Sequence, residues 1–168
     1  METVTALKQA EGQLLLVADK IRAFSAKLED LVFRAQRIAA SRKNGVKPMD
    51  TMYSYDLQNF RRDMRTFSNE VAALPSIVNG IERMARFDER CVKPASSVWR
   101  ACGRLNSALA TLRDQACLAH SHIRESDARI EAWYIVQETE QLADKGKMLP
   151  EAANKILIRV STPEAPPK

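Results

Sequence analysis

Residues 7–38, LKQAEGQLLLVADKIRAFSAKLEDLVFRAQRI, decide the fold of this chain. In this stretch apolar or small residues recur at alternating spacings of three and four over five heptads: Leu7, Ala10, Leu14, Val17, Ile21, Phe24, Leu28, Leu31, Ala35 and Ile38. Such spacing puts these side chains on one face of an α-helix, as in a coiled coil. We therefore expect a long helix over residues 4–43, ended by Asn44-Gly45 because glycine readily adopts the left-handed conformation of a helix C-terminus.

A second seam of the same kind follows. Its members are Tyr53, Leu57, Phe60, Met64, Phe67, Val71, Leu74, Val78, Ile81 and Ala85. It predicts a helix over residues 50–90 with Asp50 as the N-cap. Pro75 lies inside this helix, where it removes one backbone hydrogen bond and clashes with the preceding turn, so we expect a kink or a break there. The seam keeps its phase across the proline, which favours a kinked continuous helix.

The third seam begins after Cys91-Val92-Lys93-Pro94. Its members are Val98, Cys102, Leu105, Leu109, Leu112, Ala116, Ala119, Ile123, Ser126, Ile130, Trp133 and Gln137. Neither glycine nor proline occurs from Leu105 to Lys145, so the pattern predicts one helix over residues 95–145. The seam weakens between Ala119 and Ser126, and a break near residues 121–126 is the alternative.

The expected fold is all-α, an elongated antiparallel three-helix bundle with coiled-coil-like packing, because short connections make sequential helices antiparallel. Pro150-Glu151 predicts a short C-terminal helix that continues to about Val160. A break in the third helix would give a four-helix bundle instead. The length fits a single domain over residues 1–160, and the Pro-rich residues 161–168 are expected to be a disordered tail.

Composition points to a cytoplasmic protein without a membrane segment. The longest apolar run, residues 14–18, is far shorter than the roughly 20 residues of a membrane span. The start of the chain, Met1-Glu2, shows no signal-peptide pattern. The chain has three cysteines, Cys91, Cys102 and Cys117, and an odd number without a secretory signal predicts free, mostly buried thiols.

The formal net charge of +5 is concentrated in residues 34–65, which hold eight basic and three acidic residues. We name the basic set the first basic pole: Arg34, Arg37, Arg42, Lys43, Lys47, Arg61, Arg62 and Arg65. A local basic cluster is typical of a surface that binds polyanions. Residues 114–151 carry an acidic excess, and in an antiparallel rod they would return to this end. Intramolecular ion pairs are therefore the alternative interpretation here.

A second cluster, the second basic pole, is expected at the opposite end of the rod. It comprises Arg83, Arg86, Arg90, Lys93, Arg100 and Arg104, together with the neighbouring Trp99. No comparable acidic segment returns to it, so we expect this pole to be the better binding surface. Arginine binds phosphate or carboxylate through two parallel hydrogen bonds. Trp99 is an interface anchor, a base-stacking platform or half-buried packing at the end of the bundle.

The sequence shows no catalytic, nucleotide-binding or metal-binding pattern. It has no GxGxxG, GxxxxGK[ST], GxSxG or HExxH motif. Cys117 and His120 share a helix face, but a zinc site needs about four ligands and no partner pair is present. We therefore expect no enzyme activity, no cofactor and no metal.

Three functions remain. The first is a non-catalytic helical interaction protein, a subunit of a larger assembly that docks through its rod surface and the second basic pole. The second is sequence-nonspecific binding of DNA or RNA backbone as a small basic subunit of a nucleoprotein complex. The third is self-association as a coiled-coil structural protein, because unused seam positions could bind a second copy.

Overall fold

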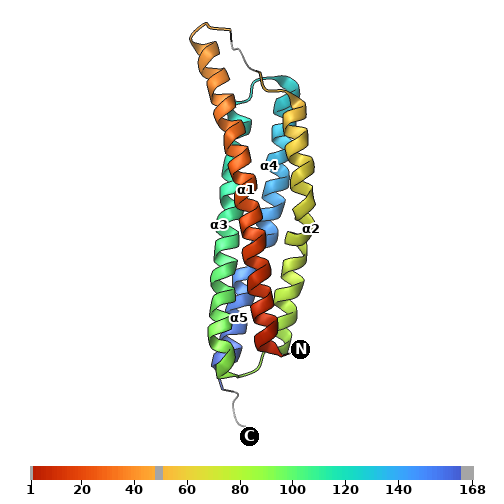
Figure 1. Ribbon diagram of the computed structural model, residues 1–168, viewed down its shortest axis with the longest axis vertical. Helices are drawn as coiled ribbons and strands as arrows, with labels where there is room; N and C mark the ends of the chain where they lie inside the picture. Colours follow the sequence, from red (N-terminus) through yellow and green to blue (C-terminus); the bar gives the residue numbers. More distant parts are fainter. Residues whose placement is uncertain (1, 48–50, 164–168) are drawn as a thin grey trace.

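The computed structural model describes residues 2–47 and 51–163. Nearly all of them are helical, no strand occurs among them, and the helices pack into one elongated bundle (Figure 1). The elements are α1 (Thr3–Lys43), α2 (Ser54–Met84), the short 3-10 turn η1 (Glu89–Cys91), α3 (Val92–His122), α4 (Ser126–Lys147) and α5 (Leu149–Ser161). Asp50, the expected N-cap, and residues 164–168 of the expected tail lie outside the described residues.

α1 follows the heptad prediction closely, whereas α2 begins at Ser54, four residues after the expected start, with Tyr53 as its N-cap in place of the expected Asp50. α1 ends in a Schellman motif: Val46 N donates to Ser41 O at 2.9 Å, Gly45 N donates to Arg42 O at 3.1 Å, and Gly45 has φ 73°. α2 runs through Pro75 without interruption. It ends at Met84, six residues before the expected end, because Ala85 is extended and the chain turns across the end of the bundle.

The third helix differs from the expectation of one continuous helix over residues 95–145. α3 ends at His122, Ile123 and Glu125 have extended backbones, and α4 begins at Ser126. The chain thus follows the alternative of a break near residues 121–126. Ile123 is fully buried at this corner, and neither glycine nor proline marks it, so burial of its side chain stabilises a turn that local sequence does not announce.

The break gives four columns of helix, with α4 and α5 in line forming the fourth (Figure 1). α1 packs most extensively on α3, and these neighbours run in the same direction. α2 packs against α4 and α5 and more lightly against α1. α2 and α3 lie diagonally across the bundle and their backbones do not approach each other closely, so the segment 85–91 must cross the end of the rod.

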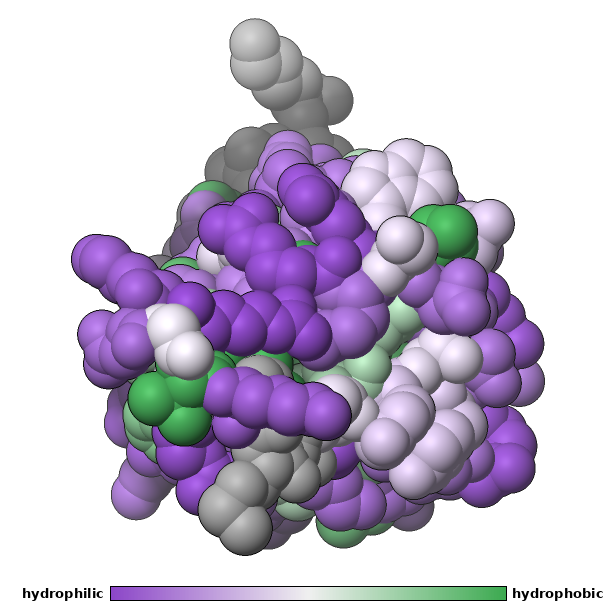
Figure 2. All heavy atoms as spheres, turned by 90° about the horizontal axis from the view of Figure 1, so that it is seen from above, coloured by the Kyte–Doolittle hydropathy of each residue, from purple (hydrophilic) through white to green (hydrophobic). Residues whose placement is uncertain are grey.

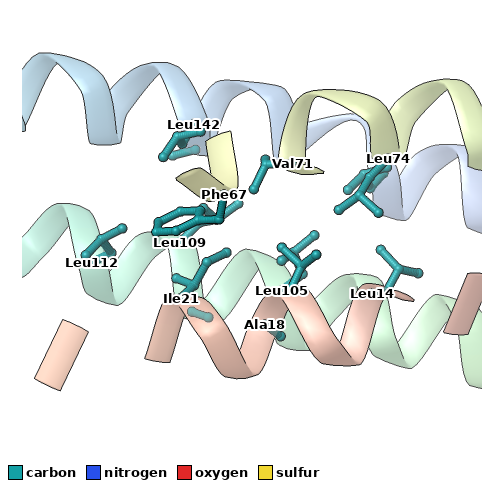
Figure 3. Close-up of a cluster of buried hydrophobic side chains, with 14 of the residues drawn as sticks. Leu14, Ala18, Ile21, Phe67, Val71, Leu74, Leu105, Leu109, Leu112 and Leu142 are labelled. Carbon is teal, nitrogen blue, oxygen red and sulfur yellow. The ribbon is translucent and has the colours of Figure 1, made fainter. Parts of the chain in front are cut away.

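The core is a continuous apolar column along the rod axis. Leu14 and Ile21 of α1, Phe67 of α2 and Leu105 and Leu109 of α3 converge in its central part (Figure 3). The ring of Phe24 lies edge-on to those of Phe60 and Phe67, at centroid distances of 5.6 and 4.7 Å. α4 and α3 approach each other closely at Gly146. An added Cβ there would lie 2.7 Å from a side-chain atom of each of Asn106 and Leu109.

Candidate functional site

Part of the first basic pole is engaged by carboxylates. Arg61 on α2 donates from Nη1 to Glu131 Oε2 at 2.7 Å and from Nε to Glu138 Oε1 at 2.9 Å, and Arg65 reaches the same Glu138 oxygen at 3.1 Å. Arg34 donates to Asp56 Oδ2 at 2.9 Å. The Arg34 and Arg61 pairs are partly buried, the Arg65 pair is more exposed, and together they tie α2 to α4 and to α1. They support the intramolecular interpretation of this pole.

The acidic partners on α4 come from the predicted segment, residues 114–151, but they contact different arginines from those that a three-helix rod would give. A three-helix rod would have placed Asp127 and Glu131 beside Arg34 and Arg37, whereas Glu131 contacts Arg61. The reason is the turn after His122, which brings α4 down alongside α2. Burial alone would lower the pKa of Arg61, but its hydrogen bonds to Glu138 and Glu131 outweigh that effect and raise the pKa.

The remaining members of the first basic pole are exposed. Arg42 Nη2 donates to Glu125 Oε1 at 2.7 Å, and Arg62 lies 3.8 Å from Asp63 in an exposed pair. Within the described chain, no ion pair forms at Arg37, Lys43 or Lys47. Figure 2 looks down on this end of the rod and shows hydrophilic residues over most of it, with pale residues of intermediate hydropathy gathered on one side.

The second basic pole is divided between two diagonal helices. Arg83 and Arg86 lie at the end of α2, whereas Arg100 and Arg104 lie on the outer face of α3. The sequence placed them together because it assumed that α2 and α3 are neighbours. In the structure Asp88 N donates to Val160 O at 3.0 Å, so the connecting segment is fixed against the end of α5 instead.

Within the α2 half of the second basic pole, two arginines are already occupied by internal groups. Arg86 Nη1 donates to the carbonyl oxygens of Ala85 at 2.8 Å and Arg83 at 3.2 Å, which satisfies free carbonyls at the end of the helix. Arg90 pairs with Asp88 at 2.9 Å and with Glu2 at 3.5 Å. The hydrogen bond from the Arg90 side chain lowers the pKa of Asp88.

The α3 half is more open. Lys93, Arg100 and Arg104 are exposed and form no ion pair with any described residue; Arg100 Nη2 donates to Ser96 Oγ at 3.2 Å. Trp99 is 47% exposed. It is therefore neither fully buried packing nor a fully solvated side chain.

Besides Trp99, large apolar side chains on α4 are exposed, including two that the heptad pattern predicted in the core. Ile130 and Trp133 are 53% and 48% exposed, and Tyr134 is also exposed. The core positions of α4 are instead Ala128, Ala132, Ile135, Thr139, Leu142, Ala143 and Gly146. The break at residues 123–125 resets the helical phase, so the seam predicted through Ile130 and Trp133 is wrong from Ser126 onward.

Two tyrosines at the start of α2 lie across a hollow from the first turn of α4, which directly precedes Ile130. Tyr53, also expected in the core, is exposed, and its ring stacks on that of Tyr55 at 5.4 Å. A surface hollow of about 410 Å³ joins them to residues 125–128 of α4. We call the whole group the aromatic surface: Tyr53, Tyr55, Ile130, Trp133 and Tyr134. One sequence pattern could have predicted this exposure: Ala128, Ala132 and Ala143 form an alternative buried face for this helix, which competes with the heptad seam through Ile130 and Trp133.

Among residues 2–47 and 51–163, no three His, Cys, Asp or Glu side chains lie close enough to hold a metal ion. Cys117 is exposed, whereas Cys91 and Cys102 are buried. Burial raises the pKa of Cys102 to about 12. None of the helices in the described chain is long and apolar enough to cross a membrane.

Comparison with known proteins finds no relative: no protein-family model, no curated protein and no solved structure matches this chain.

Proposed function

We propose that this protein is a non-catalytic helical subunit of a larger assembly and that it docks on a protein partner through the aromatic surface. The observation that carries the proposal is the outward position of Trp133 and Ile130 on a helix whose inner face is built from small residues. Exposed apolar side chains that are clustered and rimmed by polar groups are typical of interaction sites.

The composition of the aromatic surface also fits a protein interface. Trp, Tyr and Arg are the residues most enriched among interface hot spots. Arg61 lies with its guanidinium carbon 4.7 Å from the centroid of the Tyr134 ring, and the rings of Trp133 and Tyr134 are 5.5 Å apart. Because Glu131 and Glu138 hold Arg61 in place, the Tyr134 ring is partly ordered before binding, which lowers the entropy cost of association.

The test compares tagged chains expressed in cells and cross-linked before purification, with quantitative mass spectrometry of the recovered proteins. Ile130→Ala/Trp133→Ala removes the centre of the aromatic surface. We expect it to reduce recovery of a specific partner at least tenfold, because loss of a hot-spot side chain weakens binding by about 2 kcal/mol or more. Circular dichroism checks that the helices persist.

Phe33→Ala/Leu118→Ala is the matched control, because both side chains are exposed and belong to α1 and α3. Trp99→Ala is a further arm, which tests the anchor expected from the sequence. Recovery that falls with Trp99→Ala and not with the α4 variant would contradict the proposal. A dimer of the wild-type chain that the α4 variant converts to a monomer would also contradict it, since the partner would then be a second copy.

A further inference from the structure

The outer face of α3 carries a regular stripe of cations and hydroxyls. Its members recur at spacings of four and three: Lys93, Ser97, Arg100, Arg104, Ser107 and Thr111. We call it the α3 basic stripe. It spans about 27 Å at the 1.5 Å rise of a helix. Five of the six side chains are exposed, and Ser97 is half-buried.

The stripe is unbalanced in charge. α3 contains no acidic residue before Asp114, and its three stripe cations form no ion pair with any described residue. The parallel neighbour α1 brings Lys8, Glu11 and Asp19 to the same half of the rod, and Asp19 is engaged by Arg22 at 3.1 Å. The other neighbour there, α5, brings Glu151, which is engaged by Lys155 at 3.7 Å. The face therefore complements an extended anion.

The side chains favour nucleic acid over an acidic protein helix. A docking helix needs several apolar anchors at helical spacing, and this face offers only Trp99 beside the stripe. Guanidinium and hydroxyl groups are the donors that contact phosphate oxygens in nucleic-acid complexes. Trp99 adjoins the stripe beside Arg100, and an added Cβ at Gly103, one turn further on, would meet no atom within 4 Å. Open space next to an exposed indole suits stacking on an unpaired base.

We infer that the α3 basic stripe binds the phosphodiester backbone of single-stranded nucleic acid, with Trp99 stacking on one base. The site is separate from the aromatic surface, so it is independent of the proposed docking function. A protein that carries both would bring a nucleic-acid strand and a protein partner to the same assembly.

The experiment measures binding of fluorescent mixed-sequence RNA and DNA strands, and of a duplex, to the whole protein by anisotropy. Three phosphate contacts predict a slope of about −2 for log affinity against log salt, or a loss of about 20-fold between 50 and 200 mM. Arg100→Gln/Arg104→Gln should reduce the slope to about −0.7. Trp99→Ala should weaken binding of single strands at least about fivefold and leave the slope unchanged.

Arg124→Gln/Arg129→Gln is the matched control, because it removes the same charge from two exposed arginines that form no ion pair with any described residue. Its slope should equal that of the wild type. Equal losses in both double variants, tighter binding of duplex than of single strands, or a slope near zero would overturn the inference. Polyglutamate that competes as well as the RNA strand would also overturn it and would indicate an acidic protein partner.

Discussion

Arg61 Nη1 lies 2.7 Å from Glu131 Oε2, so a single guanidinium on α2 is fixed to α4, and its Nε holds Glu138 one heptad further along. All three side chains are mostly shielded from solvent. We predict that Arg61→Gln lowers the free energy of unfolding by about 2 kcal/mol, because two partly buried carboxylates lose a charged donor. Urea unfolding followed by circular dichroism measures it.

Arg62→Gln serves as the control for this prediction, because the pair of Arg62 with Asp63 is long and exposed. Its free energy of unfolding should stay within about 0.5 kcal/mol of the wild-type value. A double-mutant cycle with Glu131→Gln should give a coupling energy for the Arg61 pair. Additive single effects would show that the two residues do not interact.

The same change, isoleucine to alanine, at two positions tests which face of α4 is buried. Ile123→Ala should cost about 2 to 4 kcal/mol of folding free energy, since Ile123 is fully buried and a cavity would remain. Ile130→Ala should cost less than about 0.5 kcal/mol, because that side chain is 53% exposed. Similar losses at both sites, from denaturant midpoints, would favour the uninterrupted heptad seam.

Gly146 should resist substitution although it lies in a helix. Gly146→Ala gains helix propensity but places a Cβ 2.7 Å from Asn106 Oδ1 and Leu109 Cδ1. Because Leu109 is buried in the core and has little room to shift, overpacking should cost about 1 to 3 kcal/mol. Thermal unfolding should therefore show a net loss. Gly12→Ala, with nothing within 4 Å of the new methyl, should instead stabilise the protein by about 0.5 to 1 kcal/mol. A gain at both positions would argue against the close α3–α4 contact.

Cys102 should make stability fall at alkaline pH. Burial raises its pKa from 9.0 to about 12, so the folded chain keeps a proton that the unfolded chain releases. The stabilisation is complete below pH 9 and is lost as the pH rises toward 12. From pH 8 to 10.5 the wild type should lose about 2 kcal/mol more than Cys102→Ala. Parallel pH profiles for the two proteins would exclude this cause.

Thiol labelling gives an independent check on burial. Cys117 is exposed and should react rapidly with a thiol reagent in the native protein. Cys91 and Cys102 are buried and should react only when the chain unfolds. The Cys117→Ser variant should therefore be unreactive until denaturant is added. Fast labelling of that variant would mean that the bundle opens more readily than its packing implies.

The heptad seams predict the buried residues correctly wherever a helix runs uninterrupted from its start. Leu7 through Ile38 and Leu57 through Ala85 line the core almost without exception, because the 3.6-residue period of a helix is a local property. The same spacing failed after Ile123, where the chain turns without a glycine or proline. Trp133 was consequently expected in the core and lies on the surface.

Composition and periodicity are local, so they predict that this chain is helical, where α1 and α2 form and where charge is concentrated. Which charges meet depends on how the helices pack. The diagonal placement of α2 and α3 separates Arg86 from Arg100, and the turn at Ile123 carries Glu131 to Arg61. The diagonal placement and the turn both depend on how helices far apart in the sequence pack around one apolar core. The spacing of residues within a single helix does not specify that packing.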